Sequence, residues 1–390
     1  MGRESRGYFS LQAMVFALVA AAFVNIYLTQ PVQPELAKEF GVGASLAALS
    51  VSAVILGIFL ANLPFGLLAD RLPIRPIIVA GCLAVAAGGL LCALSSNLWL
   101  LVAGRFLQGL FIPALTTCLA AYLGRSLPLP MLNVAMGSYV AATVVGGMFS
   151  RLLGGYCGAA DWRLAFYLGG GLVLAAGWAA WRWLPREANR EEEADNHEGF
   201  GRILKRPELL RPYAATFASM FVFSSLFNFM PFYLAGPHFK AGTAVITSMY
   251  LSYLMGVVIS PLAGRAANRL GSGLAMILGA ALFILAALLS LVPDLSAMAA
   301  SLTLVCAGHF TVHSVAAGAL NSRLAAGRGK ANSLYVLFYY LGAWCGITIS
   351  GWAYGAGGWP AVVSVGLAVL LAPLGIGLWE RRLGRAASSA

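Results

Sequence analysis

Long, nearly uninterrupted apolar stretches, separated by short polar segments, run along the whole chain. A helix needs about 20 apolar residues to cross the hydrocarbon core of a bilayer. Twelve stretches reach that length, at residues 12–32, 44–66, 75–95, 99–122, 132–157 and 162–184, and again at 211–235, 242–264, 272–292, 296–320, 332–355 and 359–379. The strands of a membrane barrel are shorter and alternate apolar with polar positions. The pattern therefore predicts twelve transmembrane helices.

A polar motif that follows the second stretch returns half a chain later. Gly66-Leu-Leu-Ala-Asp70-Arg71 corresponds to Gly264-Arg-Ala-Ala-Asn268-Arg269, which begins 198 residues further on. The fourth and tenth stretches also match each other, at Gly104-Arg105-Phe106 and Gly308-His309-Phe310. Internal repeats of this kind build many secondary transporters, so the spacing predicts a duplication of six spans.

The two repeats predict a simple domain organisation. We expect an all-α integral membrane protein in which residues 1–184 form an N-terminal six-helix bundle and residues 212–390 form a pseudo-symmetric C-terminal one. Residues 185–211 carry an acidic tract followed by a basic segment, and runs of charge like these are usually solvated. We expect them to form a cytoplasmic linker between the bundles.

Composition indicates a bilayer as the natural solvent and excludes a soluble globule. Only 10% of the residues are charged and 60% are hydrophobic, whereas soluble domains carry about 25% charged residues. The net charge of +11 would suit a nucleic-acid partner, but the lysines and arginines gather in alternate loops. Positive loops stay in the cytoplasm. We therefore expect no nucleic-acid partner and both termini in the cytoplasm. We also expect a monomer.

The repeated polar motif also carries a family resemblance. Residues 66–71, together with Arg75, resemble the signature cytoplasmic loop between the second and third helices of the major facilitator superfamily. The chain departs from that signature at Pro73 and Ile74, where Gly and Arg are expected. The resemblance implies transport by alternating access across a bacterial inner membrane and a charged gate on the cytoplasmic side. The gate residues it assigns are Gly66, Asp70, Arg71 and Arg75, with Asn268 and Arg269 as a weaker second latch.

The charged pair of this motif has a simpler alternative role. Asp70 and Arg71 could serve only to anchor the turn and to set the orientation of the helices in the bilayer. A carboxylate flanked by cations at a helix end favours the state that keeps its partners near. We therefore expect the pair to bias the transporter between two states.

Arg105 is the main charged residue within a predicted span. Placing an arginine at the centre of a membrane helix costs at least about 2.5–3.5 kcal/mol, so the side chain needs a wet cavity or a partner. Gln108 lies three residues further on and shares its face of the helix. Two roles remain open for Arg105, a structural one with bonds to backbone carbonyls or to Gln108, and a role in substrate binding or coupling.

A pair of histidines lies in the tenth span. His309 and His313 are four residues apart and therefore share one face of a helix. All fourteen acidic residues fall in loops or at the ends of spans, so any coupled proton would have to use another group. Histidine titrates near pH 6.5, which makes these two the candidates for proton coupling. No Asp or Glu accompanies them in the sequence, and we expect neither a metal site nor a cofactor.

Other polar and aromatic residues of the spans are candidates for the same substrate or coupling site. The family places its first, fourth, seventh and tenth helices around a central cavity, and the candidates fall mainly on these and on the fifth and eleventh. They are Asn25, Gln30, Tyr139, Arg151, Asn228 and Tyr339, in addition to Arg105, Gln108, His309 and His313.

The sequence as a whole predicts a secondary active transporter rather than an enzyme. The chain resembles the drug and sugar efflux branch of the superfamily, in particular bacterial permeases of the arabinose-efflux type, which implies export of a small organic solute with protons as the coupling ion. One alternative is uptake or exchange of a small organic or phosphorylated anion, held by Arg105 and Arg151. A remoter alternative is a membrane sensor or a membrane enzyme.

Overall fold

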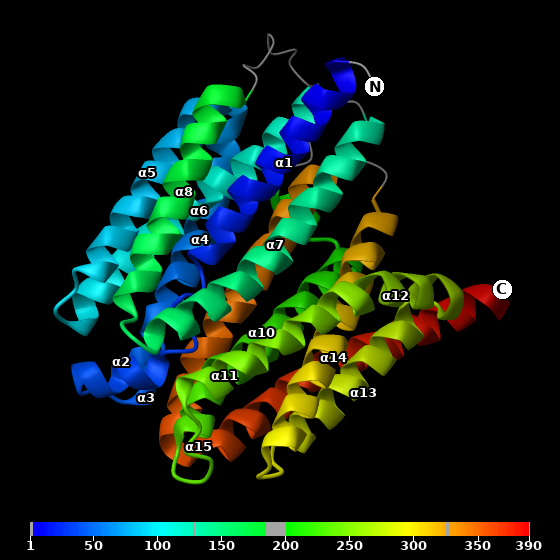
Figure 1. Ribbon diagram of the computed structural model, residues 1–390. Coiled ribbons are helices and arrows are strands. Elements are labelled where there is room, and N and C mark those ends of the chain that lie inside the picture. Colours follow the sequence, from blue (N-terminus) through cyan, green and yellow to red (C-terminus); the bar gives the residue numbers. More distant parts are fainter. Residues whose placement is uncertain (1–2, 128, 185–199, 325–327, 390) are drawn as a thin grey trace. The chain divides into compact units, whose positions relative to one another are not determined.

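A computed structural model describes residues 3–127, 129–184, 200–324 and 328–389, and in these ranges the regular structure is entirely helical (Figure 1). Ten of the described helices are long and apolar enough to cross a membrane. One of them, Gly329–Leu383, is broken by non-helical dihedral angles at Gly357 and Gly358. A further apolar helix, Leu11–Val24, is shorter. The predicted all-α membrane fold is confirmed, while the exact number of twelve crossings remains a prediction.

The chain divides into two compact units. Unit 1 contains residues 1–42 and 49–193, and unit 2 contains residues 43–48 and 194–390. The described chain resumes with a short helix, α9 (Phe200–Ile203), and α10 begins at Pro207, four residues before the expected end of the linker. The acidic tract of that linker lies outside the described residues, and the bundle boundaries at 184 and 212 remain a prediction.

Unit 1 is built from pairs of packed helices. In it α1 packs on α7, α4 on α6, and α5 on both α6 and α8. Apolar residues of α1, α2, α6 and α8 form a core around Trp162 and Phe166. Its helices are α1 (Arg3–Val24), α2 (Gln33–Phe40), α4 (Leu49–Arg71), α5 (Ile74–Ala93), α6 (Leu98–Ser126), α7 (Leu129–Gly158) and α8 (Arg163–Trp183).

Unit 2 repeats this pattern of packing. Here α10 packs on α15 and α14, α13 packs on α14 and α15, and α12 packs on α14 (Figure 1). A short 3₁₀ segment separates α11 from α12. Besides α9, its helices are α3 (Ala44–Ala47), α10 (Pro207–Ala235), α11 (Thr243–Met249), η1 (Tyr250–Tyr253), α12 (Leu254–Leu270), α13 (Ser272–Leu289), α14 (Leu295–Ser322) and α15 (Arg328–Ser389).

The repeat is visible in how closely the helix backbones approach one another. A Cβ atom added to Gly146 of α7 would lie 2.6 Å from the carbonyl oxygen of Ala20 on α1. Two hundred residues later, a Cβ added to Gly346 of α15 would lie 2.2 Å from the carbonyl oxygen of Phe221 on α10. Small residues allow such contacts between membrane helices. Both units therefore use glycine at the same repeated position.

Candidate functional site

Arg105 lies at the centre of a buried polar network in unit 1. Its side chain is fully buried on α6. The Nε atom donates to the carbonyl of Ser50 at 2.8 Å, and Nη1 donates to the carbonyl of Asn25 at 2.6 Å. Nη2 donates to the carbonyl of Ile26. Because α1 ends at Val24, the guanidinium supplies donors to the carbonyls of Asn25 and Ile26, which no continuing helix satisfies.

Gln108 and Asn25 extend this network to neighbouring helices. The Oε1 atom of Gln108 accepts from Nη1 of Arg105 at 2.6 Å, and its Nε2 donates to the carbonyl of Val85 at 3.2 Å and to Oδ1 of Asn25 at 3.4 Å. The Nδ2 atom of Asn25 donates to the carbonyl of Gly169 at 3.1 Å. The network thus connects the end of α1 to α4, α5, α6 and α8.

The hydrogen bonds of Arg105 match the structural role that the sequence left open, in which its guanidinium bonds to backbone carbonyls or to Gln108. All three of its nitrogens donate to protein oxygens, three of the acceptors being backbone carbonyls and the fourth Gln108. The sequence could not name the carbonyls, because those of Asn25 and Ile26 become available only where α1 ends and that of Ser50 lies on another helix, α4. Direct contact between Arg105 and a solute remains a proposal.

Arg151 occupies a second buried position in unit 1. It is 1% exposed on α7, where its Nε donates to Oε1 of Gln30 at 2.6 Å and its Nη1 donates to the carbonyl of Gly147 at 2.7 Å. The guanidinium carbon lies 3.9 Å from the centre of the Tyr27 ring, a cation–π contact. Tyr139, also on α7, is half-buried. The structure therefore brings Gln30 to Arg151, while Tyr139 keeps an accessible side.

His309 is the buried member of the histidine pair in unit 2. Its side chain is 1% exposed on α14, and its Nδ1 lies 2.9 Å from the hydroxyl of Ser219 on α10. The imidazole stacks on the Phe223 ring, with centroids 4.1 Å apart. Its Nε2 atom is buried and has no hydrogen-bond partner among the described residues. The aromatic neighbours of His309 are a feature that sequence reasoning found only in part.

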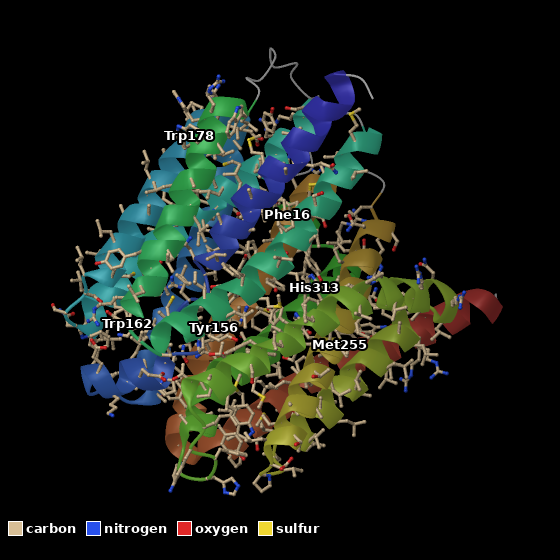
Figure 2. The ribbon with its side chains drawn as sticks, viewed as in Figure 1. Phe16, Tyr156, Trp162, Trp178, Met255 and His313 are labelled. Carbon is tan, nitrogen blue, oxygen red and sulfur yellow. The ribbon has the colours of Figure 1, made fainter. Side chains whose placement is uncertain are left out.

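His313 is half-buried and lies one turn further along α14 (Figure 2). Its Nδ1 lies 3.0 Å from the hydroxyl oxygen of Tyr335 and 3.3 Å from that of Thr216. The imidazole rings of His309 and His313 are stacked with centroids 5.9 Å apart, and the ring of Tyr339 lies 5.2 Å from that of His313. Three of the predicted site residues of unit 2 thus form one cluster, whereas the fourth, Asn228, is fully buried further along α10.

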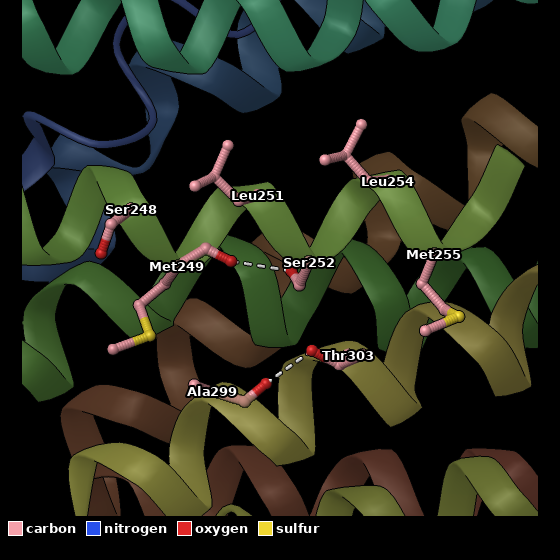
Figure 3. Close-up of a pocket in the computed structure, with 8 residues that line it drawn as sticks. All are labelled: Ser248, Met249, Leu251, Ser252, Leu254, Met255, Ala299 and Thr303. Carbon is pink, nitrogen blue, oxygen red and sulfur yellow. Dashed lines mark hydrogen bonds between the residues drawn. The ribbon is translucent and has the colours of Figure 1, made fainter. Parts of the chain in front are cut away.

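A groove lies along α11, η1, α12 and α14 (Figure 3). Its volume is about 390 Å³. The hydroxyls that line it are bonded to their own helices, Ser252 to the carbonyl of Met249 and Thr303 to that of Ala299. The lining is therefore largely apolar. Its residues are Ser248, Met249, Leu251, Ser252, Leu254, Met255, Ala299 and Thr303.

Asp70, the expected gate residue, is paired with Arg125 rather than with Arg71. Nη2 of Arg125 donates to Oδ1 of Asp70, and Nη1 donates to the carbonyl of Ala69 at 2.7 Å. Arg71 is exposed at the end of α4, and the guanidinium of Arg75 lies 4.9 Å from the centre of the Trp181 ring. Arg125 is therefore a gate candidate that sequence reasoning missed, although its position at the end of the fourth span was a signal.

The corresponding ion pair of unit 2 uses a different acid. Arg323 follows Arg125 by 198 residues, as Asn268 follows Asp70. Because Asn268 carries no charge, Arg323 instead donates from Nη2 to Glu380 of α15 at 2.5 Å. Nη1 of Arg211 donates to the same carboxylate at 2.8 Å. The second latch expected at Asn268 and Arg269 is thus accompanied by a three-residue ion-pair cluster on α10, α14 and α15.

Another charged cluster joins α2 to the start of α8. The Glu39 carboxylate accepts from Nε1 of Trp162 at 2.6 Å and from Nη2 of Arg163 at 2.7 Å. Burial of Glu39 would raise the pKa of its carboxyl, but these hydrogen bonds and the charge of Arg163 hold that pKa below its ordinary value. The cluster fixes a short amphipathic helix against the end of a long one.

Comparison with known proteins places the chain in a family. A model described as the Major Facilitator Superfamily matches residues 15–322. The MFS-type transporter YybF of Bacillus subtilis (strain 168) is 27% identical over 369 residues, which cover 93% of this chain and 91% of YybF. The inner membrane transport protein YnfM of Escherichia coli (strain K12) is 28% identical over 370 residues, which cover 89% of this chain and 85% of YnfM.

A solved structure agrees with this placement at the level of the fold. The human organic anion transporter MFSD10 (TETRAN) has a TM-score of 0.73 to this chain at 17% identity, over 95% of this chain and 99% of that protein. The transporter relatives indicate transport rather than enzymatic chemistry. Because the family model covers well over half of its length, the chain belongs to the Major Facilitator Superfamily.

Proposed function

We propose that this transporter exports a small amphipathic or sugar-like solute across a bacterial inner membrane by alternating access, in exchange for protons. Family membership and the transporter relatives support membrane transport and a multi-pass topology. The alternation of basic and non-basic loops supports cytoplasmic termini. We further propose that the monomer is the transporting form.

The histidine cluster of unit 2 is the observation that supports our proposal of proton coupling. The described carboxylates lie on α2, between helices, or near the ends of candidate spans. His309 and His313, by contrast, lie well inside α14. Histidine is the side chain that changes charge most readily near neutral pH, and an intramembrane ionisable residue is by default a functional candidate. These facts support His309 and His313 as the groups that carry the proton.

Within each unit, exposure divides the proposed site residues into two kinds. Tyr139, His313 and Tyr339 are half-buried, so they are the members that can contact a solute. The others are buried. Asn228 is fully buried on α10, and the remaining ones take part in the contacts described above; they are Asn25, Gln30, Arg105, Gln108, Arg151 and His309. We assign solute contact to the first group and positioning to the second.

Exchange or uptake of a small organic or phosphorylated anion is the second candidate function. Two arginines, Arg105 and Arg151, are buried inside unit 1, and arginine binds carboxylates and phosphates well. Export remains the first candidate, because every nitrogen of Arg105 already donates to the protein.

Reconstitution into liposomes that contain a pH-sensitive dye tests the proposed function. Neutral glycosides, organic anions and organic cations would be added one at a time under an imposed pH gradient. We expect a neutral amphipathic solute to change the internal pH in liposomes with the protein and not in empty ones. Proton flux driven only by anions would favour the second candidate, and no solute-dependent proton flux at all would refute proton coupling.

A further inference from the structure

The hydrogen bonds around His313 favour one of its two ring nitrogens as the carrier of the proton. The Tyr335 hydroxyl donates to the backbone carbonyl of His313 at 2.9 Å and also lies 3.0 Å from its Nδ1. A hydroxyl has a single hydrogen to donate. If that hydrogen went to Nδ1, the hydroxyl oxygen and the carbonyl oxygen would face each other at 2.9 Å without a proton between them.

The Nδ1–H tautomer removes this conflict. The ring nitrogen then donates to the hydroxyl oxygen of Tyr335, which passes its own hydrogen to the carbonyl, and the hydroxyl oxygen of Thr216 at 3.3 Å is a second acceptor. A neutral imidazole with a proton on Nδ1 has a lone pair on Nε2. Within the described part of the chain, no hydrogen bond reaches that Nε2 atom.

The neighbours of the His313 ring leave the Nε2 lone pair available to accept a hydrogen bond or a proton. Thr216 approaches from α10, Tyr335 and Tyr339 approach from α15, and His309 is the neighbour on α14 itself. The described carboxylates, lysines and arginines form no hydrogen bond or ion pair with His313. Because the side chain is half-buried, a solute can reach the ring, and the Tyr339 ring offers an aromatic wall beside it.

We propose that His313 presents Nε2 as a hydrogen-bond acceptor to the transported solute, so that the solute and the coupled proton compete for one lone pair. The solute class that fits is a neutral compound with a hydroxyl or N–H donor on an apolar or aromatic body. Protonation of Nε2 makes both nitrogens donors, and the bond from the solute is lost. This inference rests on the proposed proton-coupled export and gives that exchange a stoichiometry of one proton for one solute at this site.

Competition of this kind fixes the sign of the pH dependence of binding. Below the pKa of His313, the affinity for a donor solute falls about tenfold for each pH unit, because one proton must leave for each solute bound. An anionic solute would behave in the opposite way, since the imidazolium would attract it. The direction of the pH effect therefore separates the two solute classes.

Nitrogen NMR of the full chain in nanodiscs, labelled with [15N]histidine, tests the tautomer without any ligand. His313→Gln assigns the signal. We expect His313 to be protonated on Nδ1, to take up its second proton on Nε2, and to lose the Nδ1 preference in Tyr335→Phe. A neutral His313 protonated on Nε2, or a preference that Tyr335→Phe leaves unchanged, would overturn the assignment.

Calorimetric binding between about pH 8 and pH 4, a range that includes histidines shifted downward by burial, tests the competition with three probes. These are phenyl β-D-glucopyranoside, its tetra-O-methyl ether, which has the same body without donors, and phenylacetate. We expect the glucoside to bind, more weakly as the pH falls, and its ether to bind at least tenfold more weakly. In His313→Gln, whose amide oxygen is an acceptor that does not titrate, glucoside binding should be weaker than in the wild type at pH 8 and should not change with pH.

His238→Gln is the matched control, because His238 is an exposed histidine whose Nε2 lies 3.2 Å from the carbonyl of Pro293. It should keep the wild-type pH dependence. Glucoside binding that ignores pH, phenylacetate binding that strengthens at low pH, or no glucoside binding would each overturn the inference. Solute-driven proton flux in liposomes is a separate measurement, so the proposed function can fail while the competition at His313 holds, and the reverse.

Discussion

Removal of the Glu380 carboxylate should cost unit 2 more stability than removal of the Asp70 carboxylate costs unit 1. Glu380 is 11% exposed, and its partners Arg211 and Arg323 are 18% and 20% exposed. Asp70 is 63% exposed and Arg125 is 32% exposed. Breaking a fully buried ion pair costs about 3–5 kcal/mol, and breaking an exposed one costs about 0.2–1 kcal/mol.

Because of these exposures, we expect the two variants to lose different amounts of unfolding free energy. Glu380→Gln keeps an amide oxygen at a nearly buried site, so we expect a loss of about 2 kcal/mol, between the buried and exposed limits. Asp70→Asn should lose less than about 1 kcal/mol. Thermal unfolding of the purified protein in detergent, followed by size-exclusion chromatography after heating, measures both. Equal losses in the two variants would refute the comparison.

The repeat supplies a rescue experiment for the same cluster. Asn268 holds the position of Asp70 in the second half, and Arg323 holds that of Arg125. Asn268→Asp should therefore offer Arg323 a new carboxylate and recover part of the stability lost in Glu380→Gln. Asn268→Ser, which is polar but uncharged, is the control. If the serine restores as much stability as the aspartate, Glu380 of α15 does not take the place of an acid at position 268 of α12 as the partner of Arg323.

Four further predictions concern unit 1. Arg105→Leu leaves buried carbonyls without donors, at about 1–3 kcal/mol each, and should sharply lower the yield of folded protein; a normal yield would contradict this. Gly154→Leu places a side chain where a Cβ would meet a carbonyl oxygen at 1.9 Å, so an unchanged melting temperature would refute the close packing. The lowered pKa of Glu39 stabilises the fold above the ordinary carboxyl pKa, and this contribution is lost as the pH falls through the folded-state pKa. Arg163→Gln should flatten that acid dependence of the melting temperature. Asp70→Asn should strongly reduce transport in a liposome assay while membrane insertion stays normal, and full transport would remove Asp70 from the gate.

The membrane fold could be predicted from the sequence because its determinants are local. The length of an apolar stretch decides whether a helix can span a bilayer, and the repeat at a spacing of 198 residues indicates two similar halves. The break in α15 at Gly357 and Gly358 falls between two predicted spans. Where the first apolar stretch stops being helical was not predictable, because α1 ends at Val24 although the apolar composition continues beyond it.

Gln108, three residues from Arg105, is a local partner that the sequence indicated. The more distant partners of the charged residues could not be predicted, since they come from other parts of the chain. Arg105 bonds to carbonyls about 80 residues earlier in the sequence. Because every residue has a backbone carbonyl, residue type does not indicate which carbonyl will accept the bond. Arg125 meets Asp70 across 55 residues, and Arg211 meets Glu380 across 169. Charge and spacing identified candidate residues, whereas pairing required the packing of the helices.

The central claim, that the intramembrane histidines couple proton movement to solute export, is tested most directly by solute-driven proton flux. Liposomes with an internal pH dye would be compared for the wild type, the His309→Ala/His313→Ala double variant and the exposed control His238→Ala. The account predicts flux with the wild type and the control, and none with the double variant at equal amounts of folded protein. Wild-type flux in the double variant would contradict it.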